Sequence, residues 1–261
     1  MGRRLLPCYP AAGDGTGAPC FSGHCKALTV PGNCFFCGGA GRRRESENPG
    51  TALNKPASEH LILFTRYPEP GVAKTRLIPA LGPGGAAALQ RWMTERMVGE
   101  MRALCRQRPV RLEIRYAGGD AHRVGRWLAF AEALCRPQAA GDLGHRLHGA
   151  LARAFAEGGR RVLALGSDCP GLSAAVMAKA LDALREHELV LGPAQDGGYY
   201  LIGLRSPQPA LFADMEWGTG SVLSRTLARA EALGLKTVLL ESLVDVDRPE
   251  DLTHIHCYSH P

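Results

Sequence analysis

The sequence predicts an α/β protein, namely a single three-layer α/β/α domain with a mixed, mainly parallel sheet and a disordered N-terminal extension. From about residue 58 onward, short apolar segments alternate with helical patterns of ten or more residues, which is typical of a sheet covered by helices on both faces. Residues 1–57 contain ten Gly and six Pro, a composition typical of irregular chain. We therefore divide the chain into an extension (1–57) and one domain (58–261).

The regular segments of the domain follow one another at short intervals. Residues 61–64 are all apolar and predict a buried strand, whereas 110–116 alternate apolar and polar residues, as a half-buried strand does. Residues 84–105 place apolar side chains at helical spacing, and Ser173 is a suitable N-cap for the helix after it. The other predicted helices are 121–133, 143–156, 173–186 and 221–233, and the other predicted strands are 161–166, 189–192, 199–204 and 236–240.

Charge and hydropathy argue against two classes of partner. The formal net charge is +6, but residues 1–57 carry +4 of it, so the domain is nearly neutral and we expect no nucleic-acid partner. The run 42–44 is Arg-Arg-Arg without interleaved aromatic residues, which favours a solvated linker over an RNA or lipid site. No apolar run approaches the roughly 18 residues of a membrane span. No signal peptide is evident, so we expect a cytoplasmic protein.

Five of the nine cysteines lie within residues 1–57. A tetrahedral zinc site is one interpretation of this spacing, but the first pair is too widely separated for a standard zinc knuckle. A flexible extension without metal is the favoured alternative. The other cysteines form no obvious disulfide framework, which fits a reducing compartment. The four candidate zinc ligands are Cys20, Cys25, Cys34 and Cys37.

Residues 70–77, PGVAKTRL, follow the first predicted strand and end in two cations that flank a hydroxyl group. A turn of this kind holds phosphate, because backbone N–H groups at a helix start and Lys or Arg side chains neutralise an anion. The segment is not a P-loop, because Ala73 stands where that motif needs Gly. An ordinary solvated helix start is the alternative. We expect the side chains of Lys74 and Arg76 to be exposed, with Thr75 between them at the phosphate.

Three carboxylates lie where two predicted strands end. Asp168 follows strand 161–166, at the edge where open α/β sheets bind ligands. Asp245 and Asp247 are two residues apart, so their side chains share a face in extended chain. Such a pair is suited to Mg²⁺ (or Mn²⁺), which takes one or two carboxylates plus phosphate oxygens. Helix capping by Asp168 or Asp247, with a solvated Asp245, is the alternative.

Two polar, Gly-rich segments complete the candidate site. Residues 195–198 contain Asp196, Gly197 and Gly198. Gly-Gly lets a ligand approach the backbone, although Asp-Gly is also a common hairpin turn. Residues 138–146, QAAGDLGHR, lead into a helix and supply Gln138, Asp142 and Arg146 as further candidates for substrate binding. Each segment alone is ambiguous.

Together these segments resemble the GT-A-like nucleotide-diphospho-sugar transferase superfamily. The chain looks closest to a family labelled as glycosyltransferases of arsenosugar biosynthesis, which is related to guanylyltransferases that activate 2-phospholactate or phosphoenolpyruvate. Residues 1–57 have no counterpart in this resemblance. The resemblance rests on FTRYPEPGVAKTRL (64–77), QAAGDLGHR (138–146), GSDCPGL (166–172), DGGYYLIGL (196–204), WGT (217–219) and DVD (245–247).

The resemblance implies a Mg²⁺-dependent transferase that uses a nucleotide or nucleotide-sugar donor and a small-molecule acceptor. Lys74 and Arg76 would hold phosphates, Asp168 would bind metal with the Asp245–Asp247 cluster, and Gly197-Gly198 would border the acceptor pocket. Lys74, Arg76 and Asp168 are therefore the candidate catalytic residues. Glycosyl transfer and nucleotidyl transfer both fit, including guanylyl-type transfer to a small phosphorylated acid. A nucleotide-binding protein without turnover is the non-enzymatic alternative.

Overall fold

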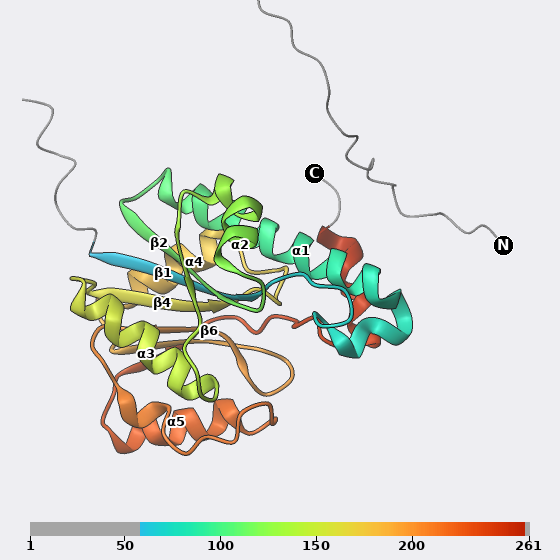
Figure 1. Ribbon diagram of the computed structural model, residues 1–261. Helices are drawn as coiled ribbons and strands as arrows, with labels where there is room; N and C mark the ends of the chain where they lie inside the picture. Colours follow the sequence, from blue (N-terminus) through green and yellow to red (C-terminus); the bar gives the residue numbers. More distant parts are fainter. Residues whose placement is uncertain (1–57, 259–261) are drawn as a thin grey trace, which may run out of the picture. The chain divides into compact units, whose positions relative to one another are not determined.

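The structure is a computed structural model that describes residues 58–258. At its centre is a seven-stranded sheet in the order β3-β2-β1-β4-β6-β5-β7 (Figure 1). Neighbouring strands are parallel except where β6 pairs with β4 and β5, so the predicted mixed, mainly parallel sheet is confirmed. The strands are β1 (Glu59–Arg66), β2 (Val110–Ala117), β3 (Leu134–Pro137), β4 (Arg161–Gly166), β5 (Leu189–Pro193), β6 (Tyr199–Leu204) and β7 (Thr237–Leu239).

Helices cover both faces of the sheet, which confirms the three-layer arrangement (Figure 1). Alternate residues of a strand point to opposite faces. Leu61 and Leu63 of β1 therefore pack in one apolar cluster with α1, α2 and α4, whereas Ile62 packs in another with α3 and α5. The helices are α1 (Ile78–Cys105), α2 (Ala121–Trp127), α3 (Leu143–Ala156), α4 (Ala174–Ala183) and α5 (Val222–Ala232).

Two predicted helices differ from the structure at one end, and one strand was not predicted. The long helix predicted from residue 84 follows a kink at Gly82, whose positive φ and following proline separate it from a short helical turn that begins at Ile78 and was not predicted. The helix predicted over 121–133 ends at Trp127 and gives way to a 3₁₀ turn, η3 (Ala129–Ala131). The edge strand β3 was not predicted at all, because its four residues include Arg and Pro and carry no apolar pattern.

A third, smaller apolar cluster joins two loops that are far apart in the sequence. It combines Leu77, which ends the 3₁₀ turn η2 (Thr75–Leu77), with Val246 and with residues of α1. Leu252 and Ile255 of the C-terminal 3₁₀ segment η5 (Pro249–Tyr258) pack against it. Leu77 and Val246 are both fully buried. The cluster therefore fixes the segment after β1 against the segment after β7.

No helix within residues 58–258 is long and apolar enough to cross a membrane. The cysteines considered for zinc and the Arg-Arg-Arg run at 42–44 lie outside the described residues. The division at residue 57, the zinc alternative and the cellular location therefore stay predictions.

Candidate functional site

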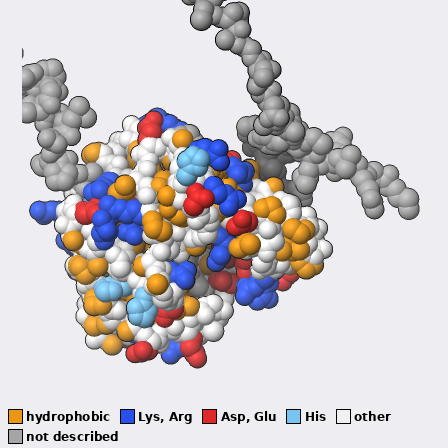
Figure 2. Space-filling model, viewed as in Figure 1, with side chains coloured by type: hydrophobic (Ala, Val, Ile, Leu, Met, Phe, Trp, Pro, Cys, Tyr) orange, Lys and Arg blue, Asp and Glu red, His pale blue; other side chains and the backbone are white. Residues whose placement is uncertain are grey.

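The candidate site lies at the switch point of the sheet. Strands β1 and β4 are parallel neighbours, and the chain leaves β1 toward β2 before it returns to β4 on the other side. Such a point opens a crevice at the carboxyl ends of the strands. Here a cleft of about 580 Å³ is present, and basic and acidic side chains meet around it (Figure 2). It is lined by Phe64, Thr65, Arg66, Val72, Lys74, Thr75, Arg76, Gln90, Ala117, Gln138, Leu143, Arg146, Gly166, Ser167, Asp168 and Asp247.

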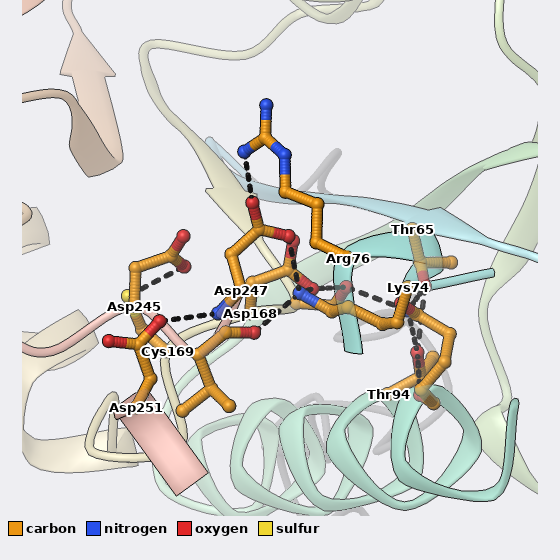
Figure 3. Close-up of polar contacts among 12 residues, drawn as sticks. Thr65, Lys74, Arg76, Thr94, Asp168, Cys169, Asp245, Asp247 and Asp251 are labelled. Atoms are coloured by element: carbon orange, nitrogen blue, oxygen red, sulfur yellow. Dashed lines mark hydrogen bonds and ion pairs between the residues drawn. The ribbon is translucent and has the colours of Figure 1, made fainter. Parts of the chain in front are cut away.

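Lys74 is the centre of the polar contacts in this cleft (Figure 3). Its ammonium nitrogen lies 3.0 Å from Asp168 Oδ1 and 3.7 Å from Asp247 Oδ1, and it donates a hydrogen bond of 2.7 Å to the carbonyl oxygen of Val246. Only 3% of the side chain is exposed, so the prediction of an exposed Lys74 was wrong. Its backbone is left-handed (φ 50°, ψ 48°), a conformation that non-glycine residues hold only where their surroundings impose it.

Arg76 behaves as predicted, because 64% of its side chain is exposed. Its guanidinium contacts Asp247 Oδ2 at 2.5 Å, on the side of that carboxylate away from Lys74. Asp247 therefore meets a cation at each of its oxygens. Thr75, between the two cations, is exposed and lines the same cleft.

The carboxylates keep the Lys74 ammonium charged. Burial alone would lower the pKa of Lys74, but the negative charges of Asp168, Asp245 and Asp247 outweigh burial and raise the pKa above its usual value. The site therefore holds a buried, permanent positive charge.

Asp245 differs from the other two acids. Its Oδ1 atom accepts a hydrogen bond of 3.6 Å from the buried thiol of Cys169, and its carboxylate lies apart from the Lys74 contacts (Figure 3). Burial, followed by the charge of Asp168, raises the pKa of Asp245 to about 7. The neutral acid is therefore the favoured form below neutral pH.

Replacing Asp245 with Asn should remove a pH-dependent penalty on stability. The native pKa lies above the unfolded value, so the native state binds the extra proton between about pH 4 and 7, and stability falls as pH rises through that window. The melting temperature of the Asn variant, measured in EDTA, should exceed that of the wild type by several degrees at pH 8 and by little at pH 5. The scale is on the order of 1–3 kcal/mol. An equal difference at both pH values would contradict the prediction.

A buried network of hydroxyl and amide groups supports the cleft, and the sequence analysis missed it. The Gln90 amide nitrogen lies 3.2–3.3 Å from the hydroxyl oxygens of Thr65, Thr94 and Ser167, which share its two N–H donors. The Ser167 hydroxyl donates to Asp168 Oδ1 over 3.2 Å. The network therefore links helix α1 to the carboxylate that contacts Lys74. The sequence held one indication of this network, namely the polar residue Gln90 among the apolar positions of the helix predicted over residues 84–105.

Two of the three candidate residues in segment 138–146 line the cleft, and the third caps a helix. Gln138 donates to the carbonyl oxygens of Thr65 and Arg115, and its own oxygen accepts from Arg146. Gln138 and Arg146 line the cleft. Asp142 instead caps α3 by accepting from the backbone N–H of His145, and it also contacts the ring of that residue at 2.8 Å. These backbone and ring contacts lower the pKa of Asp142.

The loop with Asp196, Gly197 and Gly198 connects the antiparallel strands β5 and β6 and is not among the residues that line the cleft. Asp196 accepts from the backbone N–H of Gly198 at 2.8 Å, which is an Asx-type turn. Asp196 is near enough to Asp245 to raise the pKa of that residue. The loop therefore borders the acidic side of the site.

Gly197 has a structural reason to be Gly. Its φ is +88°, and a Cβ atom there would fall on the carbonyl group of Gly220. Gly197→Ala should therefore lower the melting temperature by several degrees, since the strained φ and the backbone clash together cost more than about 2 kcal/mol. Gly149→Ala in helix α3 is the matched control, because its added methyl group meets no atom within 4 Å. The control should raise stability by about 0.5–1 kcal/mol.

The donor set fits a divalent cation in a limited way. Carboxylate oxygens are ligands that Mg²⁺ prefers, and Asp168 and Asp247 both approach one ammonium. Within residues 58–258, however, no three acidic, His or Cys side chains are arranged as a metal site. Mg²⁺ commonly uses one or two carboxylates together with substrate phosphates, and the Asp168–Asp247 pair suits that mode. A site shared by all three acids stays a prediction.

The chain is similar to one described protein family and to several solved structures. The family described as "Uncharacterized protein conserved in bacteria (DUF2064)" matches residues 100–219. A solved structure from Desulfovibrio desulfuricans G20, whose description as a nucleotide-diphospho-sugar transferase is provisional, is 33% identical, with 76% of this chain and 86% of that chain covered and a TM-score of 0.71.

A second solved structure shares the fold at much lower identity. It is 4-diphosphocytidyl-2C-methyl-D-erythritol synthase from Anaerococcus prevotii DSM 20548, which is 12% identical, with 77% of this chain and 98% of that chain covered and a TM-score of 0.51. At this identity the likeness concerns the fold alone. No curated protein matches the chain.

Proposed function

We propose that this chain, which belongs to the DUF2064 family of the GT-A-like nucleotide-diphospho-sugar transferase superfamily, transfers a group from a nucleotide-linked donor to a small-molecule acceptor with the help of a divalent cation. The observation that carries the proposal is the cluster of Lys74, Arg76, Asp168 and Asp247 in one cleft at the switch point of the sheet. The arsenosugar label stays a prediction.

The cleft suits a polyphosphate. Four cationic side chains line it, whereas only two acids do. Arg76 at its mouth and Arg146 at the start of α3 are positioned to neutralise phosphate oxygens, and Lys74 supplies a charge from within. Such fixed charges stabilise a leaving phosphate without reorganising at the moment of reaction. The cations that line the cleft are Arg66, Lys74, Arg76 and Arg146.

Nucleotidyl transfer is the reaction that this excess of cations favours. An acceptor oxygen would attack the α-phosphorus of a nucleoside triphosphate, the bond to the bridging oxygen would break, and pyrophosphate would leave with the bonding electrons. Lys74 and Arg76 would hold the leaving group, and the cleft walls would align the acceptor with it. A divalent cation held by Asp168 and Asp247 would supply further charge neutralisation.

Glycosyl transfer is the second candidate, and the 33% identical relative supports it. Here the acceptor would attack the anomeric carbon of a sugar nucleotide, and a nucleoside diphosphate would leave. The same cations would hold the diphosphate. The two reactions therefore differ in their leaving group and not in the residues that we assign.

A thermal-shift screen tests the proposal. The protein, freed of metal, is mixed with nucleoside triphosphates or sugar nucleotides, each with and without Mg²⁺. A ligand that binds only the native state raises the melting temperature by mass action. We expect a shift with at least one nucleotide in Mg²⁺, and phosphorus NMR of the products then separates pyrophosphate from nucleoside diphosphate. No shift with any nucleotide at millimolar concentration would overturn the proposal.

A further inference from the structure

The Lys74 ammonium lies where a cation shared by Asp168 and Asp247 would lie, 3.0 Å and 3.7 Å from their nearest oxygens. We propose that Lys74 is a built-in counter-ion that keeps divalent cations out of the empty site, so that metal enters only together with or after nucleotide phosphates, which draw the ammonium toward themselves. The inference rests on the proposed function, because it assumes a nucleotide donor.

The ammonium is held in place and is not a passing surface contact. The carbonyl oxygen of Val246 accepts from it at 2.7 Å, and its side chain is almost fully buried. The neighbouring Leu77 and Val246 pack in one apolar cluster, which fixes both sides of the contact. The backbone of Lys74 is left-handed, a conformation that a non-glycine residue holds only where its surroundings impose it.

A divalent cation would compete with this arrangement. In the described structure both oxygens of Asp247 face a cation, and Oδ1 of Asp168 also accepts from Ser167. A metal ion placed between the carboxylates would sit against a charged ammonium in a partly buried site, where repulsion is weakly screened. Phosphate oxygens would reduce the repulsion between the metal ion and the ammonium, because they give Lys74 a new partner. They would also complete the ligand set of the metal ion.

Arg76 is a weaker barrier. Its side chain is 64% exposed and contacts Asp247 through one guanidinium nitrogen, and exposed ion pairs break at little cost. The exclusion of metal is therefore assigned to Lys74 alone.

The test measures metal binding without any nucleotide. Mn²⁺ is titrated into metal-free wild-type protein and the Lys74→Met variant, and bound metal is followed by electron paramagnetic resonance. We expect Lys74→Met to bind Mn²⁺ at least tenfold more tightly than the wild type. Arg66→Met is the matched control, because it removes one cation from the same cleft and Arg66 makes no ion pair with the site's acids in the described structure. The control should change affinity by less than threefold.

A second variant guards against misfolding. Lys74→Gln keeps a donor for Val246 and removes the charge, so it should also bind Mn²⁺ more tightly. In the wild type, adding an unreactive nucleotide should tighten Mn²⁺ binding at least tenfold.

Unchanged Mn²⁺ affinity in the folded variants would overturn the inference, as would equal wild-type affinity for Mn²⁺ with and without nucleotide. If nucleotide binds the wild type in Mg²⁺ but Lys74→Met and Lys74→Gln bind Mn²⁺ no more tightly than the wild type, this inference fails and the proposed function stands. If no nucleotide binds, the proposed function fails.

Discussion

Replacing Asp168 with Asn is expected to lower turnover by about 100-fold or more while the protein stays folded. The substitution keeps the shape of the side chain but removes the charge nearest to the Lys74 ammonium, which lies 3.0 Å away. It also removes one of the two carboxylates suited to a metal, and losing a preorganised charge of this kind costs on the order of 10²–10³ in rate. Initial rates at saturating donor, with product identified by phosphorus NMR, measure the effect.

The control for this prediction is another Asp that accepts hydrogen bonds outside the cleft. Asp120 caps helix α2 through the backbone N–H of Arg123, and Asn is as good an N-cap as Asp. Asp120→Asn should therefore leave turnover within about twofold of the wild type. Asp168→Asn takes the nearest carboxylate away from the buried Lys74 ammonium, so it should lower stability by about 1–2 kcal/mol, a loss limited by the 41% exposure of Asp168. Asp247 and the Val246 carbonyl still contact the ammonium, so the variant should stay folded. Full turnover in Asp168→Asn would remove this residue from the proposed chemistry.

The sequence predicts the parts of the site that depend on local pattern. An acid directly after an apolar strand places Asp168 at the carboxyl edge of the sheet, and the strand order then brings it next to the end of β1. The placement of Lys74 and Arg76 in the loop directly after β1 follows from the same logic. These features needed only strand–loop–helix order, which apolar periodicity reveals.

The burial of Lys74 could not be predicted in this way. It depends on Val246, which is 172 residues further along the chain and reaches Lys74 through the packing of η5 against α1. The Gln90 network was missed for a similar reason, since its partners Thr65 and Ser167 belong to other elements. Contacts of this kind have no periodicity in the sequence. They follow from the packed fold alone.

Lys74→Ala and Arg76→Ala are expected to separate binding from stability. Both variants should weaken metal-free nucleotide binding about tenfold or more, since a charge-assisted contact to phosphate is worth about 1.5–3 kcal/mol. Only Lys74→Ala should also lower the melting temperature of the empty protein, because it strips Asp168, Asp247 and the Val246 carbonyl of a buried partner. Partial exposure of both acids limits this loss to about 1–2 kcal/mol, or several degrees.

Arg76→Ala should leave the melting temperature of the empty protein almost unchanged, since the Arg76 side chain is 64% exposed. Arg185→Ala is the matched control, because Arg185 is 62% exposed and pairs with Asp182, away from the residues that line the cleft. It should alter neither binding nor stability. Calorimetry in EDTA gives the affinities, and thermal melts give the stabilities.

Adding Mg²⁺ should restore part of the stability lost in Lys74→Ala, because a metal ion can then take the place of the ammonium. A Lys74→Ala protein as stable as the wild type in EDTA would mean that the ammonium does not hold the empty site together.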